Sequence, residues 1–556
     1  MKFKFIPNFN FMRELIKILK PYIKRHVKFI LLLAFITIIT VGLSTIIPYF
    51  NGKVIDIILS TSQKKDLFIA VIILLGIYLG KYLSNLYLQN ALLKLGAQIV
   101  NDIRGNMLKK ALRLTVAYYD KHDMGYVISR TSECNSIMTL FSSSTVSLFS
   151  AILEFFGAVI ISFTINKKLF FLIAAFLPVY VILVIFSSKN ISRLTRRMLE
   201  VTANTSGKIL QIVSSVIDVK LLNLYKKHGK AIKSILNKYF LATIKQGKSL
   251  ICYSQNTQFI STILQLILLL VSGFMIIDGK ITIGTYTAFG GYATKIVGSI
   301  QAFSSIIVLV TPIQSSAIRI YEFLGLDEEN DNKQLFLEKR GIESIRFNNV
   351  SFSYGNKNVI KNFSYDIRRG DKILITGKNG VGKSTIIKLM LGFYDNYEGE
   401  IIINEKNLHH INLNNLRNNV AIVSQPCYFF YGSVMENIIY DGNKRKKEFL
   451  FYLQKKYHLH NYFQSLNHGY HTIIKNDISN LSAGQKQLIG FCRALCSQKN
   501  FMILDEATAN MEKGLKYKIL EMLFNETKNR TCLVISHDQE LNEILKNRGF
   551  KELTIK

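Results

Sequence analysis

The sequence predicts a chain in two parts: a helical region with six membrane spans, followed by an α/β domain with a mainly parallel sheet. Three observations support this prediction. Nearly half of the 556 residues are apolar (49%), which is unusual for a soluble protein of this length. The apolar segments of spanning length are found in the first 315 residues. Beyond residue 341, short β-branched segments alternate with helical ones.

Six segments are apolar and long enough to cross a bilayer, which takes about 20 residues of helix. They comprise residues 29–50, 67–87, 146–165, 169–187, 259–277 and 283–311. The last is the weakest of the six because it contains Gly, Thr, Gln and Lys295. The first is too long for the apolar core of a signal peptide, so we expect a membrane span there.

Two long polar stretches, about 88–145 and 188–258, separate the second span from the third and the fourth from the fifth. They contain no Pro and few Gly, so we expect each to be a continuous helix. Residues 188–258 are strongly basic, with only Glu200 and Asp218 as acids. The positive-inside rule therefore places both stretches in the cytoplasm, with the N-terminus and everything after residue 315.

These patterns divide the chain into four regions. We expect an amphipathic helix on the inner membrane face in residues 1–28, and a membrane domain in 29–320. An acidic run marks a linker in 321–341, and the α/β domain occupies 342–556. Its predicted strands include residues 372–376, 420–424, 501–504 and 532–535.

The distribution of charge argues against nucleic-acid binding, and the positions of the cysteines argue against a metal site. The net charge of +33 is spread over long loops and is not gathered in a stripe beside aromatic residues, so we expect no nucleic-acid partner. None of the six cysteines forms a CxxC pair, and no His cluster accompanies Cys492 and Cys496. We therefore interpret the cysteines as buried free thiols in a reducing compartment.

The strongest motif is Gly-Lys-Asn-Gly-Val-Gly-Lys-Ser at residues 377–384, between a predicted strand and a predicted helix at 385–391. This is the phosphate-binding loop pattern in its required setting. Glycines let backbone N–H groups wrap the phosphates, and the helix N-terminus adds positive potential. We expect Lys383 to reach the β and γ phosphates and the Ser384 hydroxyl to ligate Mg²⁺. The residues expected to bind ATP here are Gly377, Lys378, Asn379, Gly380, Val381, Gly382, Lys383, Ser384 and Thr385.

A second motif is an apolar strand at 501–504 that ends in Asp505 and Glu506. Ligands of such sheets lie at the carboxyl ends of the strands. We expect Asp505 to hold Mg²⁺, directly or through water, and Glu506 to act as general base toward the attacking water. Two acids at a strand end are also common on protein surfaces, and the phosphate loop is what favours the functional interpretation.

A third motif, Leu481-Ser482-Ala483-Gly484-Gln485, precedes a helix expected to start near Lys486. With these residues the sequence resembles the ABC transporter family, whose signature is LSGGQ. Ala483 replaces the first glycine. The resemblance implies that Ser482, Gly484 and Gln485 contact the γ-phosphate held by the phosphate loop of a second chain.

Single residues in the family's order extend the resemblance, and their roles are those that it implies. Tyr354 would stack on adenine. Gln425 would join Mg²⁺ and contact the membrane domain, and His537 would contact the γ-phosphate. Glu512 stands where the family usually has Asp, and residues 472–477 lack the Gly and Glu that exporters of this type often carry.

The membrane half is similar to exporters of the family at the tips of its two polar stretches. The first tip contains Tyr118-Tyr119-Asp120-Lys121-His122, and the second contains Val219-Lys220. The resemblance implies that each tip is a short transverse helix seated in an ATPase domain. It covers the chain from about residue 11 to the end.

The resemblance implies a half-transporter that exports a peptide, a lipid or an amphipathic small molecule across the cytoplasmic membrane, using ATP and Mg²⁺. An ATP-gated channel or a membrane sensor is the alternative. The partners would be a second half-transporter, the transported substrate and the lipid bilayer. A homodimer is favoured because Glu506 and His537 are both present, while Ala483 and Glu512 leave a heterodimer open.

Three ionisable residues, Lys81, Glu154 and Lys295, fall within the expected spans. Such groups are costly in a bilayer and usually face protein or water. They could line a polar translocation cavity, or they could pair with one another or lie near helix ends.

Overall fold

The computed structural model describes residues 9–60, 64–122, 124–329, 335–338, 341–355, 357–378, 380–475, 480–506 and 511–555. The chain divides into two compact units, which are described separately. The first comprises residues 1–112 and 123–326, and the second comprises 113–122 and 327–556.

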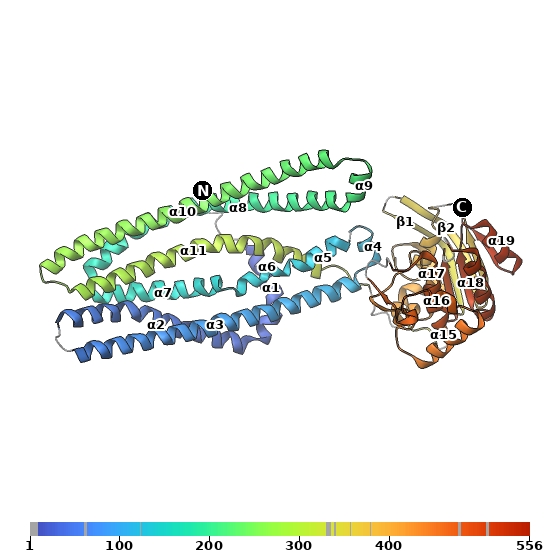
Figure 1. Ribbon diagram of the computed structural model, residues 1–556, viewed down its shortest axis with the longest axis horizontal. Helices are drawn as coiled ribbons and strands as arrows, with labels where there is room; N and C mark the ends of the chain where they lie inside the picture. The colour runs from blue at the N-terminus through green and yellow to red at the C-terminus, as the bar shows by residue number, and fades with distance from the viewer. Residues whose placement is uncertain are drawn as a thin grey trace. The chain divides into compact units, whose positions relative to one another are not determined.

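The first unit is helical, and its long helices run side by side (Figure 1). Its helices are α1 (Phe9–Arg25), α2 (Val27–Ser60), α3 (Lys64–Arg113), α5 (Met124–Ser132), α6 (Cys134–Met138), α7 (Ser143–Ile165), α8 (Lys167–Ser214), α9 (Val216–Leu221), α10 (Tyr225–Ile277) and α11 (Ile283–Leu324). Among the described residues, the helical segments that contain α2, α3, α7, α8 and α10 are long and apolar enough to cross a membrane. The sixth expected span lies in α11, where the side chains of residues 303–312 are outside the description.

Both long polar stretches are helical but interrupted, so the prediction of continuous helices was wrong. In the first, α3 ends at Arg113, and the short helix α4 (Val116–Tyr119) follows the extended residue Thr115. In the second, α9 lies at the turn between α8 and α10 (Figure 1), and Asn223 adopts a left-handed conformation. A pair of antiparallel helices must reverse direction, and Asn can do so without Gly or Pro.

Close contact between α2 and α11 holds the first unit together. A Cβ added to Gly284 would lie 2.1 Å from the Gly52 carbonyl oxygen, so the two backbones touch. The fully buried Tyr292 donates its hydroxyl proton to the Thr45 carbonyl at 3.0 Å. Such small-residue contacts are the usual way for membrane helices to pack.

The start of α11 is fixed by a carboxylate from α2. Asp56 accepts hydrogen bonds from the Gly284 N–H and the Thr282 hydroxyl, both at 2.8 Å. Thr282 also caps the helix, because its hydroxyl accepts from the Thr285 N–H at 3.0 Å. These bonds satisfy N–H groups that a helix leaves free, and the negative charge suits a helix N-terminus.

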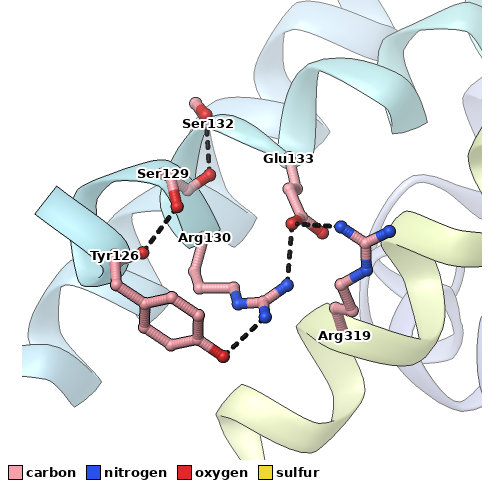
Figure 2. Close-up of polar contacts among 6 residues, drawn as sticks. All are labelled: Tyr126, Ser129, Arg130, Ser132, Glu133 and Arg319. Atoms are coloured by element: carbon pink, nitrogen blue, oxygen red, sulfur yellow. Dashed lines mark hydrogen bonds and ion pairs between the residues drawn. The ribbon is translucent and has the colours of Figure 1, made fainter. Parts of the chain in front are cut away.

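A shared carboxylate ties the joint between α5 and α6 to α11. Glu133 Oε1 lies 2.9 Å from guanidinium nitrogens of both Arg130 and Arg319 (Figure 2). Figure 2 also shows the Tyr126 hydroxyl accepting from Arg130, and the Arg130 guanidinium lies 4.4 Å from the Tyr126 ring centre. The Glu133 side chain is only 16% exposed, so two arginines share one half-buried acid.

The second unit is an α/β domain with a parallel and an antiparallel sheet. The parallel sheet has the order β11 (Lys551–Thr554), β3 (Lys372–Thr376), β10 (Thr531–Ile535), β9 (Phe501–Asp505) and β6 (Val420–Val423). The antiparallel sheet has the order β2 (Lys357–Arg368), β1 (Ser344–Tyr354), β4 (Glu398–Ile403) and β5 (Lys406–Asn407). A small pair joins β7 (Gly432–Ser433) to β8 (Ile473–Ile474).

Helices flank these sheets. They are α12 (Lys383–Met390), α13 (Leu413–Arg417), α14 (Val434–Ile438), α15 (Lys444–Lys456), α16 (His460–Gln464), α17 (Ala483–Cys496), α18 (Lys513–Glu526) and α19 (Gln539–Asn547). Every residue of β10 is buried, as is typical of a parallel strand covered on both faces. The predicted parallel sheet is confirmed, whereas the antiparallel sheet was not foreseen.

The tip of the first polar stretch belongs to the second unit. Val116 and Ala117 of α4 pack against the apolar core of the α/β domain, and Asp120 accepts a hydrogen bond from the Tyr394 hydroxyl. Burial and the Asp120 carboxylate raise the pKa of Tyr394. The Glu329 N–H donates to the Arg113 carbonyl at 2.8 Å. The domain therefore holds α4 by apolar packing, a buried hydroxyl and backbone pairing.

Gly284→Ala is expected to destabilise the helical unit by about 1–3 kcal/mol, the usual cost of overpacking, because its Cβ would meet the Gly52 backbone. The measurement is the thermal midpoint of the purified chain in detergent. Gly290→Ala in the same helix is the matched control, since a Cβ there has no neighbour within 4 Å. Equal midpoints for the two variants would show that α2 and α11 do not meet at Gly284.

Candidate functional site

Four neighbouring strands of the parallel sheet end at one edge, and each is followed by a residue of the predicted site. The phosphate loop follows β3, His537 follows β10 by one residue, Glu506 follows β9, and Gln425 follows β6 by one residue. The register aligns Ile375, Ile535 and Asp505 in one row. Because the carboxyl ends of parallel strands share an edge, residues far apart in the sequence gather there.

Two glycines give the phosphate loop its shape. Gly377 has φ +147°, and a Cβ there would lie 2.5 Å from the Ile555 carbonyl oxygen. Gly382 has φ +108° and forms the N-cap of α12. The helix begins at Lys383 rather than at Thr385, so Ser384 and Thr385 lie in its first turn. Asn379 lies outside the described residues.

The Lys383 ammonium group lies over the loop. Its Nζ donates to the carbonyl oxygens of Gly377 and Lys378, both at 2.9 Å, and the residue is 6% exposed. Burial lowers the pKa of Lys383, although the carboxylates of Glu506 and Asp505 act in the opposite direction. A buried cation beside a helix N-terminus is suited to a phosphate group.

Asp505 lies close to the first turn of α12. Burial and the neighbouring Glu506 charge raise the pKa of Asp505, and the Ser384 side chain in that turn acts to lower it. A hydroxyl and a carboxylate are oxygen ligands that suit Mg²⁺. No group of three His, Cys, Asp or Glu side chains gathers anywhere in the described part of the chain. Mg²⁺ would therefore fit here as it usually does, on few protein oxygens together with phosphate oxygens.

Glu506 and His537 face each other across adjacent strands. His537 Nε2 lies 3.2 Å from Glu506 Oε1, and both side chains are about one-third exposed (36% and 32%). The Glu506 backbone has φ +51°, and its N–H donates to the Ile535 carbonyl at 3.0 Å. A positive φ is uncommon for Glu and often marks functional sites. The arrangement places a carboxylate and an imidazole together at the open edge of the sheet.

The antiparallel sheet contributes Tyr354 to the same region. The Tyr354 hydroxyl lies 3.4 Å from Thr385 Oγ1 in the first turn of α12, and its ring packs edge-on against Tyr394 at 5.4 Å. Tyr354 is half-buried. Gln425, at the far side of the row of strands, is exposed.

The signature residues lie at the N-terminus of α17 and not at the phosphate loop. Ser482 is the N-cap: its hydroxyl accepts from the Gln485 N–H at 3.2 Å, and the Gln485 side chain accepts from the Ser482 N–H at 2.9 Å. This capping box starts α17 at Ala483, three residues before the predicted start. Ser482 and Ala483 are exposed, and no contact between described residues joins Ser482, Gly484 or Gln485 to residues 377–385.

Two further predicted segments are described only in part. Glu512 is the N-cap of α18, and residues 507–510 before it lie outside the described residues. The segment before the signature contains β8, but residues 476–479 are likewise not described.

Sequence reasoning missed one ionic contact beside the site. Lys516 of α18 forms an ion pair with Asp538, which directly follows His537, and its side chain is only 9% exposed. Asp538 also caps α19 by accepting from the Leu541 N–H at 3.2 Å. A lysine in an amphipathic helix carries no sequence signal that distinguishes this position from a solvated one.

Asp505→Asn is expected to stabilise the ligand-free chain. The pKa of Asp505 is raised, so the folded protein holds its proton more tightly than the unfolded chain, and ionised Asp505 reduces stability as the pH rises through that pKa. Asn keeps an acceptor for Ser384 without the charge. The thermal midpoint near neutral pH should rise by roughly 2–4 °C, the effect of about 1 kcal/mol.

The gain should shrink as the pH is lowered toward the raised pKa. Asp441→Asn is the control and should lower the thermal midpoint near neutral pH, because a hydrogen bond from Lys446 lowers the pKa of Asp441 and so favours its ionised form in the folded protein. A less stable Asp505→Asn chain, or a gain that does not depend on pH, would contradict the burial of this charge.

Two family descriptions match the chain. Residues 30–300 match "ABC transporter transmembrane region", and residues 360–509 match "ABC transporter". The uncharacterized ABC transporter ATP-binding protein YknV of Bacillus subtilis is 26% identical over 528 residues, which are 93% of this chain and 87% of that protein.

Two relatives with more specific names are equally similar. The lactococcin-G-processing and transport ATP-binding protein LagD of Lactococcus lactis is 26% identical, over 88% of this chain and 70% of that protein. The ATP-dependent lipid A-core flippase of Desulfotalea psychrophila is 26% identical, over 87% of this chain and 85% of that protein. The chain therefore belongs to the ABC transporter superfamily, as an exporter-type half-transporter with one transmembrane region fused to one ATPase domain.

Proposed function

We propose that two copies of this chain form an exporter in the cytoplasmic membrane, driven by hydrolysis of ATP bound between their ATPase domains. The observation that carries the proposal is the separation of the two anion-binding elements on one chain. The buried Lys383 is bonded to the carbonyls of Gly377 and Lys378, whereas the N-terminus of α17 is exposed and, among the described residues, does not contact that loop. Each chain offers half of two sites, and a second chain completes both.

The residues at the sheet edge divide the chemistry among them. Lys383 and the loop N–H groups hold the β and γ phosphates, while Ser384, Gln425 and Asp505 supply oxygens for Mg²⁺. Mg²⁺ supplies positive charge that neutralises the phosphates when it is bound. Glu506 orients and deprotonates the attacking water, and His537, 3.2 Å from it, contacts the γ-phosphate. Tyr354 stacks on the adenine, and the partner chain contributes the signature residues Ser482, Gly484 and Gln485.

The tip of the second polar stretch, at α9, supports a second ATPase domain as the partner. In and beside α9, several apolar side chains are exposed: Val216 at 46%, Ile217 at 71%, Leu221 at 77% and Leu222 at 67%. A cluster of exposed apolar side chains at the tip of a basic, polar stretch typically marks a surface that binds another protein. The matching tip α4 is covered by the ATPase domain that follows it in the chain. We infer that α9 seats on the ATPase domain of a second half-transporter. Because Glu506 and His537 are both present in this chain, we favour a second copy of it as that partner.

The exported substrate is a peptide, a lipid or an amphipathic small molecule. Relatives named for lactococcin G transport and for lipid A-core flipping support the first two classes. The positive-inside rule places the N-terminus and the ATPase domain in the cytoplasm, because the long stretches between spans are basic. The rival function is an ATP-gated channel, which would use the same nucleotide chemistry without accumulating its substrate.

Glu506→Gln is expected to lower ATP hydrolysis by about 10²–10⁴-fold, the usual contribution of a general base, while ATP binding persists. The measurements are phosphate release and retention of labelled ATP by the purified chain. Glu521→Gln, an exposed position in α18, is the matched control and should hydrolyse ATP like the native protein. Native turnover in Glu506→Gln would remove Glu506 from the proposed chemistry.

Transport assays of the native and Glu506→Gln chains in inverted membrane vesicles distinguish an exporter from an ATP-gated channel. Native chains should concentrate a transported probe against its gradient when ATP is added, and Glu506→Gln chains should not. Movement of the probe only down its gradient would replace the exporter with the channel.

A further inference from the structure

The loop that carries His537 is short, and the sheet fixes its start. Residues 536–538 connect β10 to α19, and His537 is the middle one of the three. The last residue of β10, Ile535, is 1% exposed and pairs with both neighbouring strands. The backbone that leads into His537 is therefore held by the parallel sheet.

Asp538 holds the backbone that leaves His537. Its N–H donates a hydrogen bond to Ser536 Oγ at 3.0 Å, which closes a turn around His537. Its carboxylate caps α19 by accepting from the Leu541 N–H at 3.2 Å. Because Asp538 is bonded to residues on both sides of His537, it limits how far this histidine can move.

Lys516 of α18 holds Asp538 from outside the loop. Its ammonium group forms an ion pair with the Asp538 carboxylate and lies 3.6 Å from Glu540, in the first turn of α19. The Tyr517 hydroxyl, from the same helix, donates to Glu540 at 3.0 Å. The Lys516 side chain is 9% exposed, and lysines this buried are rare unless they are paired. Helix α18 therefore anchors both the cap and the first turn of α19.

The position of His537 matters because its contact with Glu506 joins the ends of two strands. Its Nε2 lies 3.2 Å from Glu506 Oε1, at the long end of the hydrogen-bond range. The Glu506 N–H is bonded to the Ile535 carbonyl at 3.0 Å, so the sheet also holds Glu506. A shift of about 1 Å in a positioned group can lower a reaction rate about 10²-fold. A residue that holds the His537 backbone can therefore act on the rate without touching the nucleotide.

We propose that Lys516 is a positioning residue for ATP hydrolysis. Through Asp538 it holds His537 within reach of Glu506 and of the γ-phosphate. The inference rests on the proposed function, which assigns Glu506 to the attacking water and His537 to the γ-phosphate. It adds the residue that keeps these two side chains in place.

Steady-state ATP hydrolysis by the full chain in nanodiscs tests this proposal. Lys516→Gln should lower kcat about tenfold, the effect of about 1.4 kcal/mol, because His537 loses its support. The KM for ATP should change by less than about twofold, since the lost positioning acts on the transition state and not on binding. Lys516→Arg keeps a cation and should restore most of the activity. Asp538→Asn should resemble Lys516→Gln, because Asn still caps α19 but lacks the charge.

Lys518→Gln is the matched control. Lys518 lies on the same helix, and its Nζ donates to the His458 carbonyl at 2.9 Å, so this variant also removes one hydrogen bond of α18. Its kcat should equal that of the native chain. Thermal midpoints show whether each variant folds, and Lys516→Met, which keeps the buried stem, replaces Lys516→Gln if the Gln chain does not fold.

A double-mutant cycle shows whether Lys516 acts through His537. Residual rates are measured by the release of labelled phosphate. His537→Ala should lower kcat strongly. Adding Lys516→Gln to that chain should lower kcat by less than about twofold further, because no histidine is left to position.

Native kcat in Lys516→Gln would overturn the proposal, as would a further loss of about tenfold when Lys516→Gln is added to His537→Ala. Either result would make the ion pair purely structural. The proposed function would stand, because Glu506→Gln and His537→Ala would still be impaired. Native turnover in His537→Ala would instead remove His537 from the proposed chemistry, and this inference with it.

Discussion

The parallel pairing of β3, β10, β9 and β6 is the constraint on which the candidate ATP site depends. Their register brings Ile375, Ile535 and Asp505 level, so the phosphate loop, His537 and Glu506 start at the same edge. The central strands are buried on both faces, and a slip of one residue would move every buried side chain. Backbone pairing thus fixes the 3.2 Å contact between Glu506 and His537, although 31 residues separate them in the sequence.

The same domain presents two helix N-termini to anions in different ways. At the N-terminus of α12, the buried Lys383 donates hydrogen bonds to the carbonyls of Gly377 and Lys378. The N-terminus of α17 is capped only by Ser482 and Gln485 and stays exposed. If two such domains face each other, the exposed N-terminus of α17 on one can approach a phosphate held at the N-terminus of α12 on the other. The domain also holds α4, the tip of the first polar stretch, by apolar packing and by the hydrogen bond from Tyr394 to Asp120.

Local sequence patterns predicted the helices and strands that neighbouring residues in the sequence determine. The strand β3 has the bounds that its apolar run and the following glycines indicate, and all six expected spans lie in helices. Patterns failed where distant residues decide the structure. Thr115 and Leu114 leave the helix because the backbone there pairs with Glu328, and Asn223 turns without a glycine. The Lys516–Asp538 and Lys295–Glu154 pairs join separate helices and loops, so no spacing in the sequence reveals them.

The central claim is that each ATP site is shared by two chains, and mixed dimers test it most directly. Chains with Lys383→Ala and chains with Ser482→Arg are co-expressed under different affinity tags and purified through both. Each variant alone should be inactive, and the mixed dimer, which has one intact site, should recover a measurable part of native ATP hydrolysis. A dimer of one native chain and one chain with both substitutions has no intact site and should stay inactive. Activity in that dimer, with none in the first, would contradict the account, because it would place a complete site within one chain.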